Sequence, residues 1–262
     1  MPASYPLGES PRSARISAQD RAIPGLDRGR LHEVHAEGAD RPGALAFALV
    51  AALAGTPVRP VFLIRSRGRG GSRVRLQGDG LARLGIDPAR LTLVEPPAGR
   101  DGEAALLRAG LDAARCPALG AVVIESEGRL AAYDLTASRR LALAAERSGG
   151  RVVMVRIDAE PRPSAAFTRW TVASAPSVPL PGAAPGWPTL IARLDRRRGW
   201  TGGIAHWRLE WDSSHGFFRP LPQSDPAEGE APPADAIPPA APLPRAVAAL
   251  AGLRGGPGRR AA

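Results

Sequence analysis

Strand-like and helix-like segments alternate through the first part of the chain. Segments rich in Val, Leu and Ile are expected to be buried strands, because continuous apolar runs are typical of a parallel sheet covered on both faces. The expected strands are residues 30–36, 58–64, 91–95, 119–125 and 151–157. Helices are expected between them, at residues 42–54, 80–84, 101–115 and 135–148. The alternation predicts an α/β fold with a mostly parallel sheet.

The pattern changes after Asp158, where apolar and polar residues alternate without long helices between the segments. Such alternation is typical of strands with one buried face. The expected strands here are residues 167–173, 189–194, 206–211 and 217–219. We expect them to be antiparallel. The predicted fold class is therefore α/β, with a mostly parallel sheet flanked by helices and antiparallel strands added at its C-terminal side.

Three regions are expected from composition. Residues 1–24 are predicted to be a flexible N-terminal arm, residues 25–219 a folded core, and residues 220–262 a disordered tail rich in Pro and Ala. Within the tail, residues 245–254 are a candidate partner-binding helix, and the alternative is a frayed end. Its apolar anchors would be Val247, Leu250 and Leu253.

The turn after the first expected strand has the position of a phosphate-binding loop but lacks its chemistry. Such a loop needs G-x-x-x-x-G-K-[ST], with a lysine for the phosphates and a hydroxyl for magnesium. The turn here consists of Glu37, Gly38, Ala39, Asp40, Arg41, Pro42, Gly43 and Ala44. It offers two carboxylates instead of the lysine and the hydroxyl, and its proline removes a backbone donor.

The charge favours an acidic partner. The 262 residues carry a net charge of +10, and all 35 basic residues are arginine. This charge is compatible with nucleic-acid binding, and equally with the compositional bias of a GC-rich genome. The single cysteine excludes an internal disulfide and a cysteine-cluster metal site. The four histidines show no ligand spacing, and no catalytic triad is present, so we expect no metal, no cofactor and no catalytic residues.

Several arginines are candidates for binding DNA or a partner, and each also has a plain structural interpretation. A glycine-rich segment carries Arg65, Arg67, Arg69, Arg73 and Arg75, and a turn between two expected strands carries Arg196, Arg197 and Arg198. Arginine pairs with phosphate oxygens, so both are candidate contacts to single-stranded DNA; ordinary exposed loops are the alternative. Arg139 and Arg140 are candidates for partner binding or the solvated side of a helix.

Three tryptophans fall on expected strands. Core or sheet-face packing is expected for Trp170, Trp207 and Trp211, and the last two share one face of their strand because they are four residues apart. The chain has no apolar run of membrane-spanning length, and its first residues lack the apolar middle region of a secretory signal, so a cytoplasmic location is expected.

Four stretches carry a resemblance to a known family. They are GLDRGRLHEVHA (residues 25–36), AAYDLTASRRLALAAERSGG (131–150), SAAFTRWTVASAPS (164–177) and HWRLEWDSSHGFFRP (206–220). The order of the expected strands and helices, with the first of these stretches at the front, resembles the core of RecA-type recombinases, and within that superfamily the chain is most similar to the ImuA family of RecA-like and SulA-like accessory proteins.

The resemblance implies that the ATPase positions have been replaced. Pro42, Gly43 and Ala44 stand where RecA-type ATPases carry the lysine and hydroxyl of the phosphate loop. The neighbourhood of the water-activating glutamate contains Arg65, Ser66 and Arg67. The magnesium-side aspartate corresponds to Glu125, a strand-end carboxylate that we expect to be satisfied by an arginine or a helix N-terminus. No ATP hydrolysis is expected.

The resemblance also implies a function. ImuA proteins take part in SOS mutagenesis, a damage-induced form of DNA repair by translesion synthesis. The chain would be a non-catalytic adaptor beside the Y-family protein ImuB and an error-prone DnaE-type polymerase, with RecA and single-stranded DNA as further candidate partners. Two alternatives remain open: a SulA-like inhibitor of cell division, and an ATP-dependent DNA-binding protein of the RecA type.

Overall fold

The computed structural model describes residues 26–54, 59–65, 75–97, 101–199 and 205–221. These residues form an α/β fold built on one mixed β-sheet, whose strands lie in the order β3-β2-β4-β5-β1-β6-β7-β8-β9. The strands are β1 (Leu31–Ala36), β2 (Val61–Arg65), β3 (Leu91–Val94), β4 (Ala121–Glu127), β5 (Arg151–Ile157), β6 (Thr168–Ala175), β7 (Thr189–Arg197), β8 (Ala205–Asp212) and β9 (Phe217–Pro220). The α-helices are α1 (Arg41–Leu53), α2 (Gly78–Arg83), α3 (Gly102–Ala114) and α4 (Leu135–Ser148). The predicted fold class is confirmed.

The sheet changes direction one strand later than the sequence pattern indicates. Strand β6 pairs with β1 in parallel, and only β7, β8 and β9 run antiparallel to their neighbours. The expectation that β6 is antiparallel is therefore wrong. Alternation along a strand reports which face is buried, and it does not encode the strand's direction.

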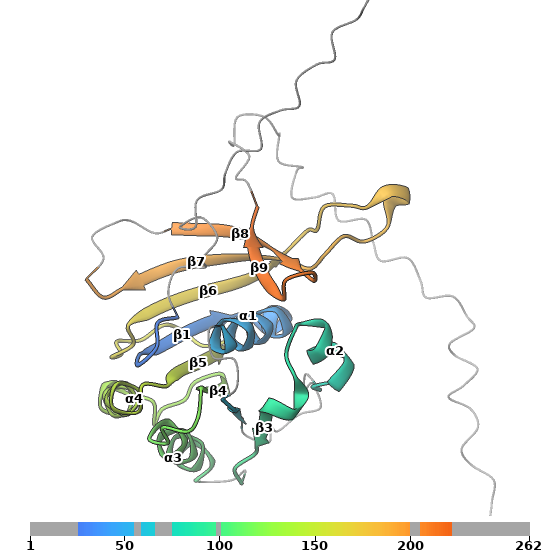
Figure 1. Ribbon diagram of the computed structural model, residues 1–262. Helices are drawn as coiled ribbons and strands as arrows, with labels where there is room; N and C mark the ends of the chain where they lie inside the picture. Colours follow the sequence, from blue (N-terminus) through green and yellow to red (C-terminus); the bar gives the residue numbers. More distant parts are fainter. Residues whose placement is uncertain (1–25, 55–58, 66–74, 98–100, 200–204, 222–262) are drawn as a thin grey trace, which may run out of the picture. The chain divides into compact units, whose positions relative to one another are not determined.

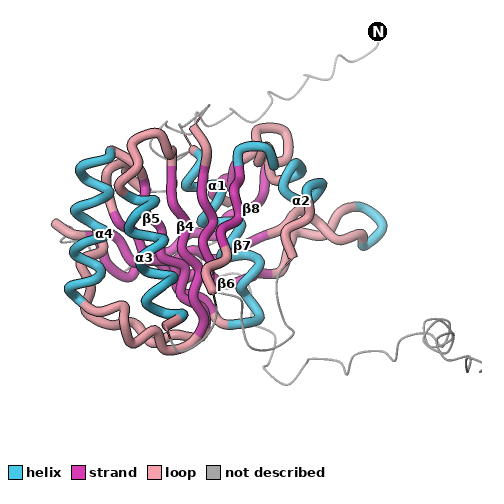
Figure 2. The backbone as a smooth tube through the Cα atoms, turned by 90° about the horizontal axis from the view of Figure 1, so that it is seen from below, coloured by secondary structure: helices cyan, strands magenta, loops and turns pink. Residues whose placement is uncertain are grey.

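Two apolar cores lie on opposite faces of the sheet, as Figure 1 and Figure 2 show for the covering helices. Helices α1 and α2 pack on one face, over Val34 of β1 and Trp170 of β6. Helices α3 and α4 pack on the other face, over Leu31 of β1 and Ile124 of β4. Because β1 alternates between the two cores, it is buried on both faces.

Helix α4 is capped at both ends by residue types that commonly end helices, whereas α3 lacks a side-chain cap. The Asp134 side chain accepts a hydrogen bond of 2.7 Å from the backbone N–H of Ala137, and Gly149 ends α4 with a φ of +70°. Asp101 stands at the N-cap of α3, but its side chain makes no capping hydrogen bond.

The three tryptophans on the strands pack in the α1 core, as expected. Trp170 is fully buried, and its ring centroid lies 5.8 Å from that of Phe47 and 5.6 Å from that of Trp207. Trp211 is buried on the same face of β8, against Phe218. The face shared by Trp207 and Trp211 therefore packs on the α1 core.

The connection from β5 to β6 differs from the other crossovers between parallel strands. The connections from β1, β2, β3 and β4 each contain a helix. Residues 158–167, which lead from β5 to β6, form neither helix nor strand. Beyond β1, the sheet face covered by α3 and α4 therefore has no crossover helix.

The predicted arm (1–24) lies outside the described residues, as does the predicted tail from residue 222 onward, with Val247, Leu250 and Leu253. The tail's first residue, Pro220, is the last residue of β9.

Candidate functional site

The turn between β1 and α1 is fastened by two carboxylates of the chain itself. The backbone N–H of Gly38 donates a hydrogen bond of 2.7 Å to Asp158 Oδ1, and the N–H of Ser174 donates one of 2.8 Å to Asp40 Oδ1. Asp158 adopts a φ of +49°, which is uncommon for a residue with a side chain. In a phosphate loop, backbone N–H groups of this turn bind anions. Here Gly38 binds the Asp158 carboxylate.

A group of arginines and glutamates occupies the carboxyl ends of the central strands. We call Arg41, Arg65, Glu95, Glu125 and Glu127 the strand-end ion cluster. Arg41 Nε lies 3.5 Å from Glu125 Oε1, and Arg41 also pairs with Glu127. Arg65 Nε lies 3.6 Å from Glu95 Oε1, and Arg65 Nη1 lies 3.9 Å from Glu125 Oε2. Glu125 is thus held between two guanidinium groups.

Three members of the cluster are largely removed from water, whereas Glu127 is 61% exposed. The side chains of Arg41, Arg65 and Glu125 are 11%, 12% and 8% exposed. Burial raises the pKa of Glu125, and the nearby charges of Arg41 and Arg65 oppose that rise. Among the described residues, no group of three His, Cys, Asp or Glu side chains is arranged to hold a metal ion.

A second buried polar group lies on the opposite face of β1 from Val34. Glu33 accepts hydrogen bonds from the hydroxyl of Tyr133 at 2.9 Å and from Arg169 Nε at 2.7 Å. Burial acts to raise the pKa of Glu33, but His35, Ser164 and Arg169 together outweigh it and lower that pKa to about 2. Burial, with the Glu33 carboxylate beside it, raises the pKa of Tyr133 well above its usual value. The carboxylate therefore ties β1 to β6 and to the segment before α4.

Sequence reasoning missed this Glu33 group. The signal available in the sequence is that Glu33 and His35 stand two apart, so two polar side chains share one face of an expected buried strand with Leu31. Their partners lie far away in the sequence, so the local pattern does not identify them.

His32 bridges β1 and β6 on the α1 side. Its Nδ1 lies 2.7 Å from the hydroxyl of Thr168, and its Nε2 lies 2.9 Å from the carbonyl of Asp27. The indole N–H of Trp170 donates to the same hydroxyl at 2.9 Å. Burial lowers the pKa of His32 to about 4, so the ring is neutral at pH 7.

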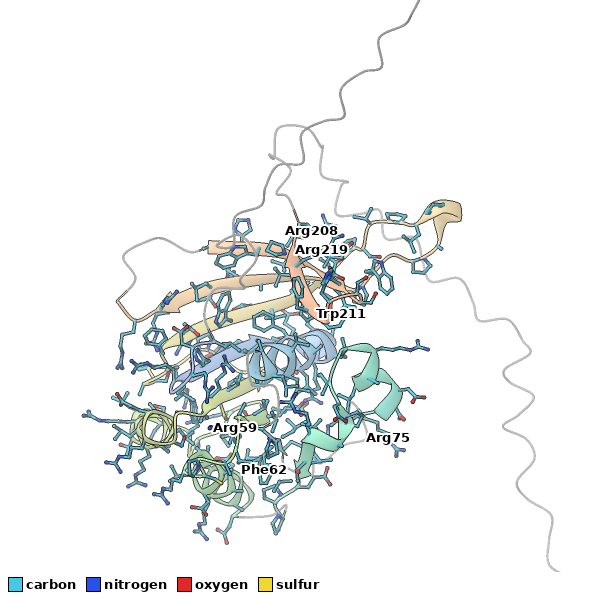
Figure 3. All side chains as sticks on the ribbon, viewed as in Figure 1. Arg59, Phe62, Arg75, Arg208, Trp211 and Arg219 are labelled. Atoms are coloured by element: carbon cyan, nitrogen blue, oxygen red, sulfur yellow. The ribbon has the colours of Figure 1, made fainter. Side chains whose placement is uncertain are left out.

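The candidate DNA-binding arginines have different surroundings. Arg65 belongs to the strand-end ion cluster and does not present its guanidinium at the surface. Arg196 Nη2 donates to the carbonyls of Ser164 and Ala166 at 3.1 and 2.8 Å, which fixes it against the connection to β6. Arg75 is exposed near α2 (Figure 3).

Arg197 is the last residue of β7, and Arg198 follows it in the connection to β8, which we call the β7 hairpin. Arg197 stacks over the Phe167 ring at 5.6 Å and pairs with Asp27 at 3.5 Å, whereas Arg198 is exposed. The candidates Arg67, Arg69 and Arg73 lie outside the described residues.

The candidate partner-binding residues Arg139 and Arg140 are both exposed on α4. They flank this helix on two sides, because each lines a different hollow beside it. No helix among the described residues combines the length and apolar character needed to span a bilayer.

The chain is similar to a curated bacterial protein known from two strains. The chain is 39% identical over 158 residues to Protein ImuA of Caulobacter vibrioides, from strain NA1000 / CB15N and from strain ATCC 19089 / CIP 103742 / CB 15. The matched part is 55% of this chain and spans 60% of the length of these curated relatives. No family model matches the chain. The resemblance to the ImuA family is confirmed by this similarity.

Proposed function

We propose, from the ImuA family membership that this similarity supports, that the chain is a non-catalytic RecA-like adaptor in damage-induced translesion DNA synthesis. It would assemble with ImuB and an error-prone DnaE-type polymerase, with RecA as a further candidate partner. The strand-end ion cluster is the observation that carries the non-catalytic part of this proposal.

The cluster occupies the place where an open α/β sheet usually binds its ligand. Such sheets bind ligands in the crevice outside the carboxyl ends of their strands. At those ends, Glu125 is engaged by Arg41 and Arg65. Binding of Mg²⁺ by Glu125 would require breaking ion pairs that are mostly buried. The adaptor would therefore keep the RecA-like fold as a scaffold while its nucleotide site is closed by its own side chains.

Nucleotide binding tests this part directly. Isothermal titration of the full chain with ATP and Mg²⁺ is expected to give no saturable heat at millimolar ATP, and phosphate release is expected to stay at background with single-stranded DNA present. RecA of the same organism is the positive control. DNA-stimulated phosphate release that Glu125→Ala abolishes would contradict the proposal.

Direct contact with single-stranded DNA is the second part of the proposal. The glycine-rich segment after β2 and the β7 hairpin are its candidate surfaces, and phosphate contacts by arginine make affinity depend on salt. The double variant Arg67→Ala/Arg69→Ala is expected to bind labelled single-stranded DNA more weakly and with a shallower salt dependence, as measured by fluorescence anisotropy. A matched control is Arg83→Ala/Arg115→Ala, which removes two exposed arginines elsewhere. Equal affinities for both double variants would refute the DNA contact.

A further inference from the structure

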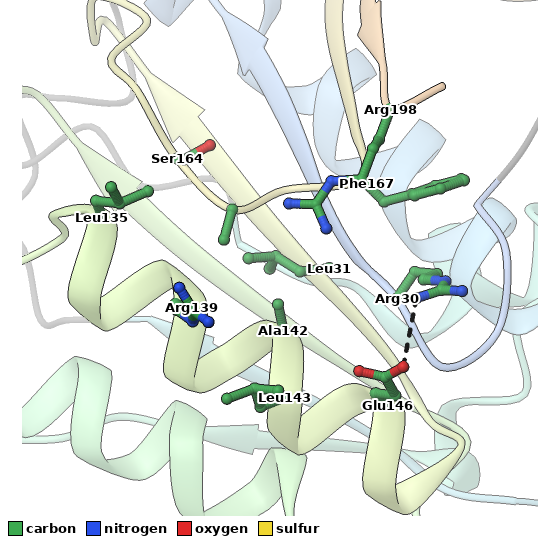
Figure 4. Close-up of a pocket in the computed structure, with 11 residues that line it drawn as sticks. Arg30, Leu31, Leu135, Arg139, Ala142, Leu143, Glu146, Ser164, Phe167 and Arg198 are labelled. Atoms are coloured by element: carbon green, nitrogen blue, oxygen red, sulfur yellow. Dashed lines mark ion pairs between the residues drawn. The ribbon is translucent and has the colours of Figure 1, made fainter. Parts of the chain in front are cut away.

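A groove runs along α4, between this helix and the segment that leads into β6 (Figure 4). We call it the α4 groove; its volume is about 330 Å³. Leu135, Ala142 and Leu143 of α4 form one side, and Phe167 stands at the start of β6 on the other. This volume is within the range of pockets that bind ligand-sized groups.

The topology explains why the groove is open. The β5–β6 connection crosses the same sheet face as α3 and α4, since its Ala166 packs in their core. The N–H of Ala165 donates to the Ser138 hydroxyl of α4 at 3.0 Å, which holds this connection directly against the helix. The segment forms neither helix nor strand, so among the described residues no crossover helix covers α4 on that side.

Helix α4 presents apolar side chains into this open space. Leu135 is 57% exposed and Leu143 is 41% exposed. A second hollow of about 330 Å³ lies on the other flank of α4 and shares Leu143. An exposed leucine shared by two hollows, with a second one beside the groove, suits a surface that receives apolar anchors from a partner.

The rim is strongly basic. Each hollow is lined by three arginines, and Glu146 is the single carboxylate lining either one. The arginines of the α4 groove are Arg30, Arg139 and Arg198, and those of the second hollow are Arg115, Arg140 and Arg147. Arg30 pairs with Glu146 at 3.8 Å and lies over the Phe167 ring at 5.2 Å. The surface around the leucines therefore complements negative charge.

We propose that the α4 groove binds an acidic amphipathic helix of a protein partner, in the place that a β5–β6 crossover helix would fill. The apolar side of that helix would pack on Leu135 and Leu143, and its carboxylates would pair with Arg139 and Arg198. Helix-in-groove binding of this kind uses apolar anchors at helical spacing. The exposed leucines favour a protein over a nucleic acid, whose phosphates would leave them uncovered. This inference rests on the proposed adaptor function for the existence of a partner.

A synthetic peptide tests the groove without the partner. The probe is a fluorescein-labelled helical peptide with leucines at i, i+3, i+4 and i+7 and glutamates on its other face, titrated with the full chain by fluorescence anisotropy. Saturable binding is expected, and Leu143→Gln or Arg139→Glu should weaken it at least tenfold. Both residues are exposed, so the fold should be retained, which circular dichroism checks.

Two control variants are matched to the test. Leu93→Gln changes a leucine of the same exposure, 41%, on β3, and Arg83→Glu makes the same charge change on α2. Both should leave peptide affinity unchanged. Equal losses in test and control variants, equal binding of a scrambled peptide, or no saturable binding would each overturn the proposal. The proposal would also be overturned if the α4 variants lose affinity for single-stranded DNA and keep affinity for the peptide.

Co-elution with ImuB of the same organism separates this inference from the adaptor function. If the unmodified chain co-elutes and Arg139→Glu/Leu143→Gln does not, the groove proposal and the adaptor function both stand. If the unmodified chain and the double variant both co-elute, the groove is not the docking site and the adaptor function stands. If the unmodified chain does not co-elute, the adaptor function fails, and the proposed use of the groove by a partner fails with it even where the peptide binds.

Discussion

Removing Arg41 should destabilise the protein, because it leaves Glu125 buried without its nearer cation. The Arg41 and Glu125 side chains are 11% and 8% exposed, with 3.5 Å between Arg41 Nε and Glu125 Oε1. Removing one partner of a buried ion pair typically costs about 3–5 kcal/mol of stability. Arg65 remains 3.9 Å from Glu125, so we expect the lower end of this range, about 3 kcal/mol for Arg41→Ala.

This cost should appear in both chemical and thermal unfolding. For a domain of this size, 1 kcal/mol corresponds to about 2–4 °C in Tm, so Arg41→Ala should lower Tm by about 6–12 °C. Urea denaturation at pH 8 gives the free energy of unfolding. The matched control is Arg115→Ala, which removes an arginine that is 63% exposed and paired with an equally exposed Asp112. It should change stability by less than about 0.5 kcal/mol.

The pH dependence identifies the cause. Burial already raises the pKa of Glu125, and loss of the Arg41 charge should raise it further. A carboxyl whose pKa is higher in the folded than in the unfolded state binds more protons when folded, so stability increases as pH falls. The difference between Arg41→Ala and the unmodified chain should therefore shrink from pH 8 to pH 5. Adding Glu125→Gln to Arg41→Ala should recover part of the loss at pH 8. A loss below 1 kcal/mol that is equal at both pH values would refute this reasoning.

Two further predictions concern the core. Burial lowers the pKa of His32 from 6.5 to about 4, so the contribution of neutral His32 to stability is complete above pH 6.5 and is lost as pH falls toward 4, by up to about 3 kcal/mol. Urea denaturation between pH 6.5 and pH 4 should show this loss. If His32→Gln leaves the pH dependence of the free energy of unfolding unchanged, the prediction is wrong. A Cβ on Gly110 of α3 would lie 2.4 Å from Ile124 Cδ1, so Gly110→Ala should cost about 1–2 kcal/mol of stability despite the better helix propensity of alanine. Adding Ile124→Val should restore most of the loss, because it removes that methyl group. A Gly110→Ala single variant that is more stable than the unmodified chain would contradict the packing argument.

Most of the fold follows from local signals in the sequence. The apolar runs mark the parallel strands, and α4 begins at the Asp134 cap and ends at Gly149. These signals act within a few residues, so they can be read along the chain. The direction of β6 cannot be read in this way, because alternation specifies faces and the parallel pairing with β1 depends on the path of the whole β5–β6 connection.

The candidate site is less accessible to sequence reasoning. The absence of a lysine and a hydroxyl from the turn after β1 is visible in the sequence, whereas the pairings of that turn join residues far apart in the chain. Arg41 at the start of α1 pairs with Glu125 in β4, and Gly38 binds Asp158 across 120 positions of sequence. The α4 groove likewise depends on the parallel pairing of β6 with β1, because this pairing makes the helix-free β5–β6 connection a crossover.

If the proposed adaptor function and the proposed closure of the nucleotide site both hold, assembly with ImuB does not depend on ATP. Size-exclusion chromatography of the full chain with ImuB of the same organism, with and without ATP and Mg²⁺, tests it most directly. We predict co-elution that is the same in both conditions. Co-elution only in the presence of ATP would contradict the closed site, and no co-elution in either condition would contradict the adaptor function and favour the SulA-like alternative.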